Sequence, residues 1–412
     1  MKGSSRCILL LFLLGASFAQ AKTINVPADQ PTIQAAITAA VNGDTVLVAA
    51  GTYQENINFL GKLIQVKSAD GPGTTIIDGG RTAPVAVFVT GEGPNSRLIG
   101  FTLQNGLASA DNNRDGGGIY INAASPTIQN NVIKSNTACD GGAGMAVRQS
   151  SARIQGNTFT NNDQGGCTGG IGGGGIAVFG LGSAQIVHNL FSGNNWNGNG
   201  AGIALVGAGT PTVMNNNIRG NIATGGLGGG IYVANGGGEK IVQNVIQSNT
   251  ATQGAGIYMS AGANGQMVVV NTVANNHGSP VGSALYFVGS AATVQMFDNI
   301  FQGEDGGNAV FCDQTSGNPP MMVANDAYTF NGTGMTGDCT PQADKRFNIS
   351  ASPKFVKPGN YKLDSSSPVI DAGINRVPGL PKTDFGGSPR IRDGNGDGFK
   401  IIDMGAYEFQ VN

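Results

Sequence analysis

The stretch Gly117-Gly118-Ile119-Tyr120-Ile121 decides the fold, because variants of it recur through the middle of the chain. The first apolar positions of successive copies are 26, 31, 27, 28, 26 and 28 residues apart. A near-constant spacing of this size is typical of proteins built from stacked repeats. The later copies begin at Ala143, Gly174, Ala201, Gly229, Ala255 and Gly282.

Each repeat also contains a second short apolar strand that is followed by an asparagine at a fixed position. An amide side chain offers both a donor and an acceptor, so one Asn per coil can form a column of hydrogen bonds along a solenoid axis. We expect the first column to consist of Asn131, Asn157, Asn189, Asn216, Asn244, Asn271 and Asn299. A second column is expected at Asn136, Asn162, Asn194, Asn221, Asn249 and Asn276.

The strands within each repeat are short, alternate apolar and polar residues, and are separated by Gly or Asn. This pattern predicts an all-β solenoid of parallel strands with three strands per coil. The Gly pairs allow the positive φ or the close backbone approach that a corner of such a coil requires. A leucine-rich repeat has a similar period, but its Leu spacing and helical half are missing here.

Composition excludes several functional classes. The chain of 412 residues carries 23 Lys and Arg against 25 Asp and Glu, a charged share of 12% where about 25% is usual. A net charge of -2 provides no basic surface for nucleic acid or anionic lipid. A hydrophobic share of 40% excludes intrinsic disorder.

The N-terminus has the pattern of a secretory signal peptide. Lys2 and Arg6 precede an apolar run from residue 8 to residue 14, and Ala19-Gln20-Ala21 supplies a small-residue cleavage site before Lys22. The apolar run is too short to span a bilayer, which needs roughly 20 residues. We therefore expect an exported protein, secreted or at the cell surface (extracellular or periplasmic), with no membrane span in its mature chain.

Cysteine usage agrees with export. Cys7 leaves with the signal peptide, so the mature chain keeps four cysteines in an oxidising compartment. Cys139 and Cys167 lie one coil apart in the same corner, so we expect them to pair. Cys312 and Cys339 then pair around a last, irregular coil.

Beyond the repeats, the segments Ile24-Asn25-Val26-Pro27 and Thr32-Ile33-Gln34-Ala35-Ala36-Ile37 precede the first strands. With these segments the chain resembles the right-handed parallel β-helix proteins of the pectin-lyase-like superfamily over nearly all of its mature length. The resemblance implies a single-stranded right-handed β-helix with a short N-terminal capping helix, which Pro31 and Gly43 bracket. The superfamily includes lyases, hydrolases, epimerases and non-catalytic surface proteins, so it implies no single activity.

The expected organisation is a signal peptide (1–21), a cap with the first coil (22–60), β-helix repeats (61–305), an irregular coil with a disulfide loop (306–350) and a C-terminal cap region (351–412). Ser352-Pro353-Lys354-Phe355 and Asp403-Met404-Gly405-Ala406-Tyr407-Glu408 resemble the C-terminal region of exported bacterial β-helix proteins that are sorted to the surface. No hydrophobic tail follows these segments, so we expect no covalent or membrane anchor.

The loop after the second Asn column holds the strongest candidate for a carbohydrate site. Hydrolysis or β-elimination needs several positioned charged groups, and an aromatic plane can stack on a sugar ring. The candidate catalytic residues are Asp111, Asp115, Asp140 and Asp163, and Trp196 is the candidate stacking residue. An ordinary polar loop with a filler Trp is the alternative.

A column of tyrosines faces outward on three successive coils, at Tyr232, Tyr258 and Tyr286. These rings form either a carbohydrate platform or a cross-strand aromatic ladder.

Asp393, Asn395 and Asp397 place side-chain oxygens at alternate positions, as in the first half of an EF-hand calcium loop. Met404 stands where the bidentate Glu belongs, and Asp403 comes one residue early. The motif is therefore either a shortened calcium loop or a plain Asp/Gly turn.

Charged groups are sparse and scattered along the repeats, which favours a non-catalytic exported protein that binds extracellular or cell-surface glycan. The alternative is a polysaccharide lyase or glycoside hydrolase that uses the acidic corner or a groove lined by Arg148 and Arg153. We expect a monomer without nucleic-acid partners, and calcium is the one cofactor that the sequence indicates.

Overall fold

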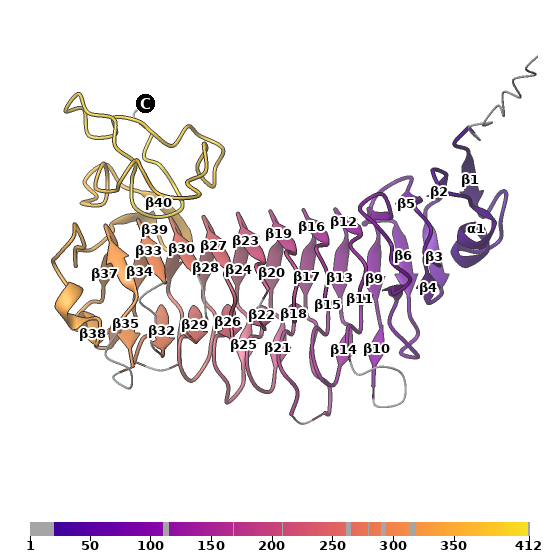
Figure 1. Cartoon of the computed structure of the whole chain (residues 1–412), viewed down its shortest axis with the longest axis horizontal. Helices are drawn as coiled ribbons and strands as arrows, with labels where there is room; N and C mark the ends of the chain where they lie inside the picture. Colours follow the sequence, from indigo (N-terminus) through magenta and orange to yellow (C-terminus); the bar gives the residue numbers. More distant parts are fainter. Residues whose placement is uncertain are drawn as a thin grey trace, which may run out of the picture.

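The structure, a computed structural model, describes residues 20–109, 115–167, 169–207, 209–260, 265–278, 280–289, 294–313 and 319–410. Within these ranges the chain winds into one stack of coils whose short strands lie side by side along a single axis, as Figure 1 shows. This confirms the predicted all-β solenoid of parallel strands. The expected signal peptide falls almost entirely outside the described residues. In the described part, no helix is long and apolar enough to cross a membrane.

Three long sheets run the length of the stack. Among the described residues, the first sheet contains β1 (Thr23–Val26), β2 (Thr45–Val48), β5 (Gln65–Ser68), β8 (Arg97–Ile99), β12 (Thr127–Gln129), β16 (Arg153–Gln155), β19 (Gln185–Val187), β23 (Thr212–Met214), β27 (Lys240–Val242), β30 (Met267–Val269), β33 (Gln295–Phe297) and β36 (Met321–Val323). The second contains β3 (Gly51–Gln54), β6 (Thr75–Asp78), β9 (Thr102–Gln104), β13 (Val132–Lys134), β17 (Thr158–Thr160), β20 (Leu190–Ser192), β24 (Asn217–Arg219), β28 (Val245–Gln247), β31 (Thr272–Ala274), β34 (Ile300–Gln302) and β37 (Asp326–Tyr328). The third contains β4 (Ile57–Asn58), β7 (Ala86–Phe88), β11 (Ile119–Asn122), β15 (Met145–Arg148), β18 (Ile176–Phe179), β22 (Ile203–Val206), β26 (Ile231–Ala234), β29 (Ile257–Ser260), β32 (Leu285–Val288), β35 (Asn308–Cys312) and β38 (Thr333–Gly337).

A few short elements complete the fold. Two-stranded parallel sheets form at the corner that leads into the third sheet, and an antiparallel pair lies in the C-terminal region. These elements are β10 (Leu107–Ala108) with β14 (Thr137–Ala138), β21 (Asn195–Trp196) with β25 (Ile222–Ala223), and β39 (Phe355–Lys357) with β40 (Asn360–Leu363). The helices are α1 (Ile33–Ala39) and the 3-10 turn η1 (Thr340–Gln342).

The core consists of inward-facing apolar residues that stack in register from coil to coil. Ile128 of β12 aligns with Ile154 of β16 and Ile186 of β19, and all three are fully buried. The rings of Phe159 and Phe191 stack with their centroids 4.7 Å apart. Because side chains alternate between the faces of a strand, the period-2 pattern of the sequence places these residues inside.

The predicted first column of asparagines is present between the first and second sheets, and it is longer than expected. In each step, the Asn Nδ2 and backbone N both donate to Oδ1 of the Asn on the next coil, as from Asn216 to Asn244 at 3.0 and 2.9 Å. Nδ2 also donates to a carbonyl of the preceding coil. The column consists of Asn131, Asn157, Asn189, Asn216, Asn244, Asn271, Asn299, Asn325 and Asn348.

A left-handed residue precedes every asparagine of this column. The sharp corner requires positive φ at that position, where Gly and Asn are favoured and a β-branched residue is strained. These residues are Asn130, Gly156, His188, Asn215, Gln243, Val270, Asp298, Ala324 and Phe347. The second predicted column is also confirmed, and its amides bond in the same way through Asn136, Asn162, Asn194, Asn221, Asn249 and Asn276.

Helix α1 closes the N-terminal end of the core. Glu55 accepts hydrogen bonds from the first helical amides, those of Ile33 and Gln34, at 2.9 Å each. Lys62 Nζ donates to the carbonyls of Ile37, Thr38 and Ala40 at the other end. Both partners complement the helix dipole. The helix lies between Pro31 and Gly43, as predicted, and covers the open end of the coil stack, as the cap of a solenoid must.

The C-terminal end of the solenoid differs from the prediction. We expected regular coils to end near residue 305 and an irregular coil to follow. Strands β35 to β38 instead extend all three sheets in parallel register as far as Gly337. The repeat is harder to recognise there because its Gly-Gly-Ile stretch has become Asn308-Ala309-Val310.

Residues 351–410 form a region that docks on the flank of the later coils, above the first Asn corner (Figure 1). Outward-facing residues of the solenoid become apolar where this region covers them. One cluster joins Val242, Val269 and Val270 to Val377 and Ile402. Val270 adopts φ 48° in spite of its β-branch, since an apolar side chain is needed at this covered corner.

A buried arginine fastens the docked region to the solenoid. Arg390 donates through Nε and Nη2 to Oε1 of Gln243, at 3.1 and 2.7 Å, and through Nη1 to Glu408 at 2.7 Å. Asp298, on the same corner as Gln243, accepts the amide hydrogen of Ile374 at 2.9 Å. The Oδ2 atom of Asp298 is buried without a hydrogen-bond partner.

Carboxyl groups outnumber cations at this junction. Burial raises the pKa of Asp298 to about 8, and burial together with the charge of Asp403 raises the pKa of Glu408 to about 9. In the unfolded chain both groups titrate near pH 4. Each carboxyl group therefore contributes its full stabilisation of the folded protein below about pH 4, where it is protonated in both states. That contribution is lost as the pH rises through the pKa of the group in the folded protein.

The Asn column predicts the effect of one substitution in its middle. Asn216→Ala removes the acceptor for the backbone N and Nδ2 of Asn189 and leaves buried polar groups unpaired. We expect the free energy of unfolding to fall by roughly 1–3 kcal/mol. Thermal melts would measure this, with Asn197→Ala, at an exposed position, as the control. Equal melting temperatures for the two variants would contradict a stabilising role for the column.

The buried carboxyls predict a pH dependence. We expect the free energy of unfolding of the wild type to decrease between pH 5 and pH 9, because Asp298 and Glu408 must ionise inside the protein. Asp298→Asn cannot ionise, so its decrease should be smaller, while the exposed control Asp70→Asn should follow the wild type. Denaturant melts across this range would test the difference. Parallel curves for wild type and Asp298→Asn would refute the assignment.

Candidate functional site

The outward tyrosines of the third sheet form a continuous aromatic ladder, which we call the tyrosine ladder. Tyr232 on β26, Tyr258 on β29 and Tyr286 on β32 occupy the same register position. Their ring centroids lie 5.6 and 5.5 Å apart, with interplanar angles of 22° and 13°. Phe311 on β35 continues the ladder, 4.9 Å from Tyr286.

Stacking determines what the ladder presents to solvent. The faces of the inner rings lie against one another, and Tyr286 is buried, so the ladder presents to a ligand the ring edges of Tyr232, Tyr258 and Phe311, which are partly exposed. Burial raises the pKa of Tyr232, Tyr258 and Tyr286, and Asp313 raises the pKa of the last two further. These phenols therefore stay protonated and remain hydrogen-bond donors. Of the two interpretations, the structure bears out the cross-strand ladder in its geometry.

The ladder ends at Tyr232 because the preceding coils carry small residues at the same register position. Ala146, Ala177 and Ala204 follow Tyr120 in this column and are fully buried, although they point out of the solenoid. Loop backbone covers them: a Cβ atom on Gly173 would lie 2.7 Å from that of Ala177. Only glycine allows this close approach.

Beside these alanines lies an ion pair that was not predicted, between a buried Asp115 and a partly exposed Arg148. Arg148 on β15 donates through Nε to Asp115 Oδ2 at 2.7 Å, and its Nη2 lies 2.5 Å from the same oxygen. The guanidinium stacks 4.3 Å above the ring of Phe179. Asp115 is thus committed to an arginine, which makes it a poor general base.

Among the described residues, the predicted acidic corner does not gather into a catalytic site. Asp111 lies outside the described residues. Asp115 aligns with Gly141, whereas Asp163 aligns with Thr137, so the strand register separates these carboxylates along the corner. Asp140 is partly exposed. Among the residues that the structure describes, no three His, Cys, Asp or Glu side chains are arranged to hold a metal ion.

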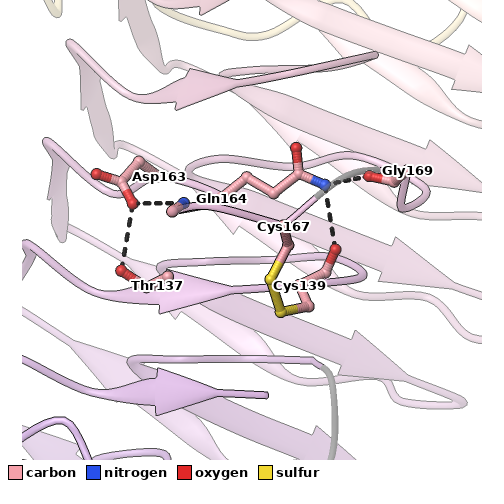
Figure 2. The surroundings of a disulfide bond; sticks show 7 residues. Thr137, Cys139, Asp163, Gln164, Cys167 and Gly169 are labelled. Carbon is pink, nitrogen blue, oxygen red and sulfur yellow. Dashed lines mark hydrogen bonds between the residues drawn. A yellow bond between two sulfur atoms is a disulfide. The ribbon is translucent and has the colours of Figure 1, made fainter. Parts of the chain in front are cut away.

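Figure 2 shows what this corner does instead. Cys139 and Cys167 form a disulfide across adjacent coils, as expected, and Cys312 pairs with Cys339. Asp163 accepts hydrogen bonds from Thr137 Oγ1 at 3.2 Å and from the Gly165 amide at 2.9 Å. The contacts of Asp163 therefore hold the loop in place.

The Gln164 side chain, buried in the same loop, donates to the carbonyls of Cys139 and Gly169. This corner is a cross-linked polar loop.

Two further predicted roles are corrected by the structure. Trp196 is fully buried in a cluster with Ala138, Ala201 and Ala223, so its indole cannot stack on an external sugar. The cluster forms because the corner strands β21 and β25 turn inward. Arg148 and Arg153 belong to the third and the first sheet, and Arg148 is paired with Asp115.

The Asp393 loop has the geometry of a hydrogen-bonded turn. Asp393 accepts the amide hydrogens of Gly396 and Gly398 at 2.7 and 2.9 Å, and Asn395 accepts that of Asp397 at 2.9 Å. Asp397 in turn accepts the amide hydrogen of Phe399 at 2.8 Å.

Asp403 does not face this turn. It is buried and accepts the amide hydrogens of Asp371 and Phe409 at 2.8 and 2.5 Å. Asp371, which the sequence did not single out, accepts from Gly394 and Asn395 instead. The arrangement favours the turn over the shortened calcium loop.

Phe311 is the ladder residue that sequence reasoning missed. The repeat was followed only to residue 305, and Phe311 lies at the position of Tyr286 on the next coil. A search for copies that allowed Asn-Ala-Val in place of Gly-Gly-Ile would have found it. The ion pair of Asp115 with Arg148 left no such signal, because it joins residues on different coils.

Comparisons with known proteins agree with this architecture. A family model described as "Right handed beta helix region" matches residues 172–320. The chain is therefore a right-handed parallel β-helix. The crystal structure of pectate lyase Pel9A superposes with a TM-score of 0.46 at 13% identity over 92% of this chain and 91% of that one, too weak a likeness to support a functional argument. A search of curated proteins found no significant match.

The turn geometry of the Asp393 loop predicts the effect of chelation. We expect EDTA to leave the melting temperature of the protein unchanged, because backbone amides already satisfy the loop oxygens. A ligand that binds only the folded form would raise this temperature by mass action. A lower melting temperature in EDTA, restored by calcium and absent in Asp397→Ala, would establish the calcium loop instead.

Proposed function

We propose that this chain is an exported β-helix protein that binds an extracellular or cell-surface glycan through the tyrosine ladder, without altering the glycan chemically. The single observation that carries the proposal is the register of Tyr232, Tyr258, Tyr286 and Phe311 on four successive coils. A row of aromatic rings 4.9–5.6 Å apart matches a ligand that itself repeats. A polymer is therefore a better partner than a single small molecule.

The spacing of the ladder separates a glycan from other polymers. Side chains on one face of an extended peptide recur about every 6.6–6.8 Å, which exceeds the 5.5 Å between adjacent tyrosine rings. Nucleic acid would require basic residues along the row, and the net charge of the chain is -2. A chain of sugar rings offers hydroxyl groups at every residue, which complements a row of phenols.

Binding is favoured over catalysis by the placement of the charged groups. Asp115 is engaged by Arg148, and Asp163 is engaged by its own loop. A lyase or glycoside hydrolase remains the alternative function. Such an enzyme would need catalytic residues other than these two carboxylates. The ladder itself contributes phenols, which stay protonated and carry no nucleophile.

Export is part of the proposal. It is supported by the signal-like N-terminus and by two disulfides, which persist in oxidising compartments. The resemblance of residues 351–410 to surface-sorting regions points to display at the cell surface. We propose that the protein acts there as a monomer, with the tyrosine ladder open to glycan.

The ladder predicts which substitution weakens binding. In a glycan panel, we expect at least one polysaccharide to bind the purified protein, and Tyr258→Phe to weaken that binding roughly fivefold, the effect of one net hydrogen bond. Phe keeps the stacked ring and removes only the hydroxyl. Tyr407→Phe, in the C-terminal region, is the matched control and should bind as the wild type does.

The same panel should be scored for unsaturated and reducing ends. We expect no release of either from a bound glycan. Release of unsaturated or reducing ends would show that the protein is a lyase or a hydrolase, and the proposal of binding without catalysis would be abandoned. Absence of binding to every glycan would refute the proposal.

A further inference from the structure

We infer that the glycan is a neutral, extended chain of equatorially linked pyranose rings that lies parallel to the solenoid axis, with one sugar residue per coil. This inference rests on the proposed function and names the class of ligand. It depends on the charge of the coils that carry the tyrosine ladder, on the spacing of the rings and on the number of rungs.

The coils that carry the ladder lack positive charge. From residue 241 to residue 344 the sequence contains no Lys or Arg. Over the same span it contains seven acidic residues: Asp298, Glu304, Asp305, Asp313, Asp326, Asp338 and Asp344. The basic residue just before this span, Lys240, lies on the first sheet, away from the ladder.

The acidic group that acts on the ladder is Asp313, whose charge raises the pKa of Tyr258 and Tyr286. A carboxylate or sulfate on the glycan would approach this negative charge and find no cation along the row. Like charges brought together at a binding surface lower affinity and exclude wrong partners. The ladder therefore selects against uronate and sulfated chains.

The spacing of the rings selects the linkage. Adjacent rings of the ladder are 5.6, 5.5 and 4.9 Å apart, close to the spacing of neighbouring strands in a sheet. A chain with equatorial bonds at both ends of each pyranose advances by about the length of one ring per residue. Axial bonds turn the chain and shorten its advance, so an α-1,4-linked chain loses register with the ladder after one or two residues.

The number of rungs sets the length of the binding site. The ladder contains Tyr232, Tyr258, Tyr286 and Phe311, and it ends where the buried alanines begin. Three of the four rungs carry a hydroxyl. Affinity should therefore rise with each sugar up to about four residues and then level off.

The experiment is a calorimetric titration of the full mature chain with four families of oligosaccharides, each from dimer to hexamer. The β-1,4-linked gluco- and manno-oligosaccharides are neutral and equatorial, and oligomannuronates keep that linkage but add charge. Malto-oligosaccharides are neutral with an axial bond, and oligogalacturonates are both charged and axial. We expect the neutral β-1,4 series to bind roughly tenfold more tightly than each of the other three families.

Variants separate the two sources of selectivity. Asp313→Asn should reduce the difference in affinity between gluco-oligosaccharides and oligomannuronates. It should leave the difference in affinity between gluco- and malto-oligosaccharides unchanged. Asp364→Asn, an exposed substitution in the C-terminal region, should alter neither difference. Tyr258→Phe should weaken the preferred series, as the proposed function requires.

The outcomes distinguish the inference from the proposed function. If charged or α-linked oligomers bind as tightly as the neutral β-1,4 series and Tyr258→Phe still weakens them, the ladder binds glycan but the inferred class is wrong. If affinity keeps rising to the hexamer, the assignment of one sugar to each of four rungs is wrong. If no family binds, the proposed function itself fails.

Discussion

The column of buried asparagines at the first corner is the interaction on which the rest of the structure depends. Each coil must turn sharply after its first strand, and the left-handed residue at the turn leaves backbone groups that the strands cannot pair. The following Asn satisfies them, as Asn216 does by donating to Ile186 O and Asn244 Oδ1. Repetition of this bond keeps every coil in the same register. The tyrosine ladder exists because that register holds its rings on neighbouring coils in line.

The same corner also provides the surface on which the C-terminal region docks. On the earlier coils the left-handed residues of this corner are polar or Gly, as at Asn130, Gly156, His188 and Asn215. Where residues 351–410 cover it, the column continues as Gln243, Val270 and Asp298, which bond or pack against that region. Docking leaves the third sheet uncovered, because its contacts are with the first and second sheets. The docked region therefore leaves the ladder partly exposed at Tyr232 and Tyr258, whereas Tyr286 is buried.

Repetition explains which features could be predicted from sequence. The two Asn columns and the parallel sheets follow from residues that recur at fixed positions in successive coils, and the same alignment places the outward tyrosines in one column and Cys139 beside Cys167. Single contacts that no recurring residue marks left no such signal. Arg148 reaches Asp115 on the preceding coil, and Arg390 reaches Gln243 across 147 residues. Trp196 was expected on the surface because corner loops are usually exposed, but here the corner strands β21 and β25 bury it.

Glycan binding by the tyrosine ladder is tested most directly by tyrosine-selective NMR. The chain contains eight tyrosines, and ring signals can be assigned by single Tyr→Phe substitutions. On titration with a neutral β-1,4-linked tetrasaccharide, the signals of Tyr232, Tyr258 and Tyr286 should shift together, while those of Tyr53, Tyr328, Tyr361 and Tyr407 should stay in place. Shifts confined to tyrosines outside the ladder, or no shift at saturating ligand, would contradict the assignment of this face as the binding site.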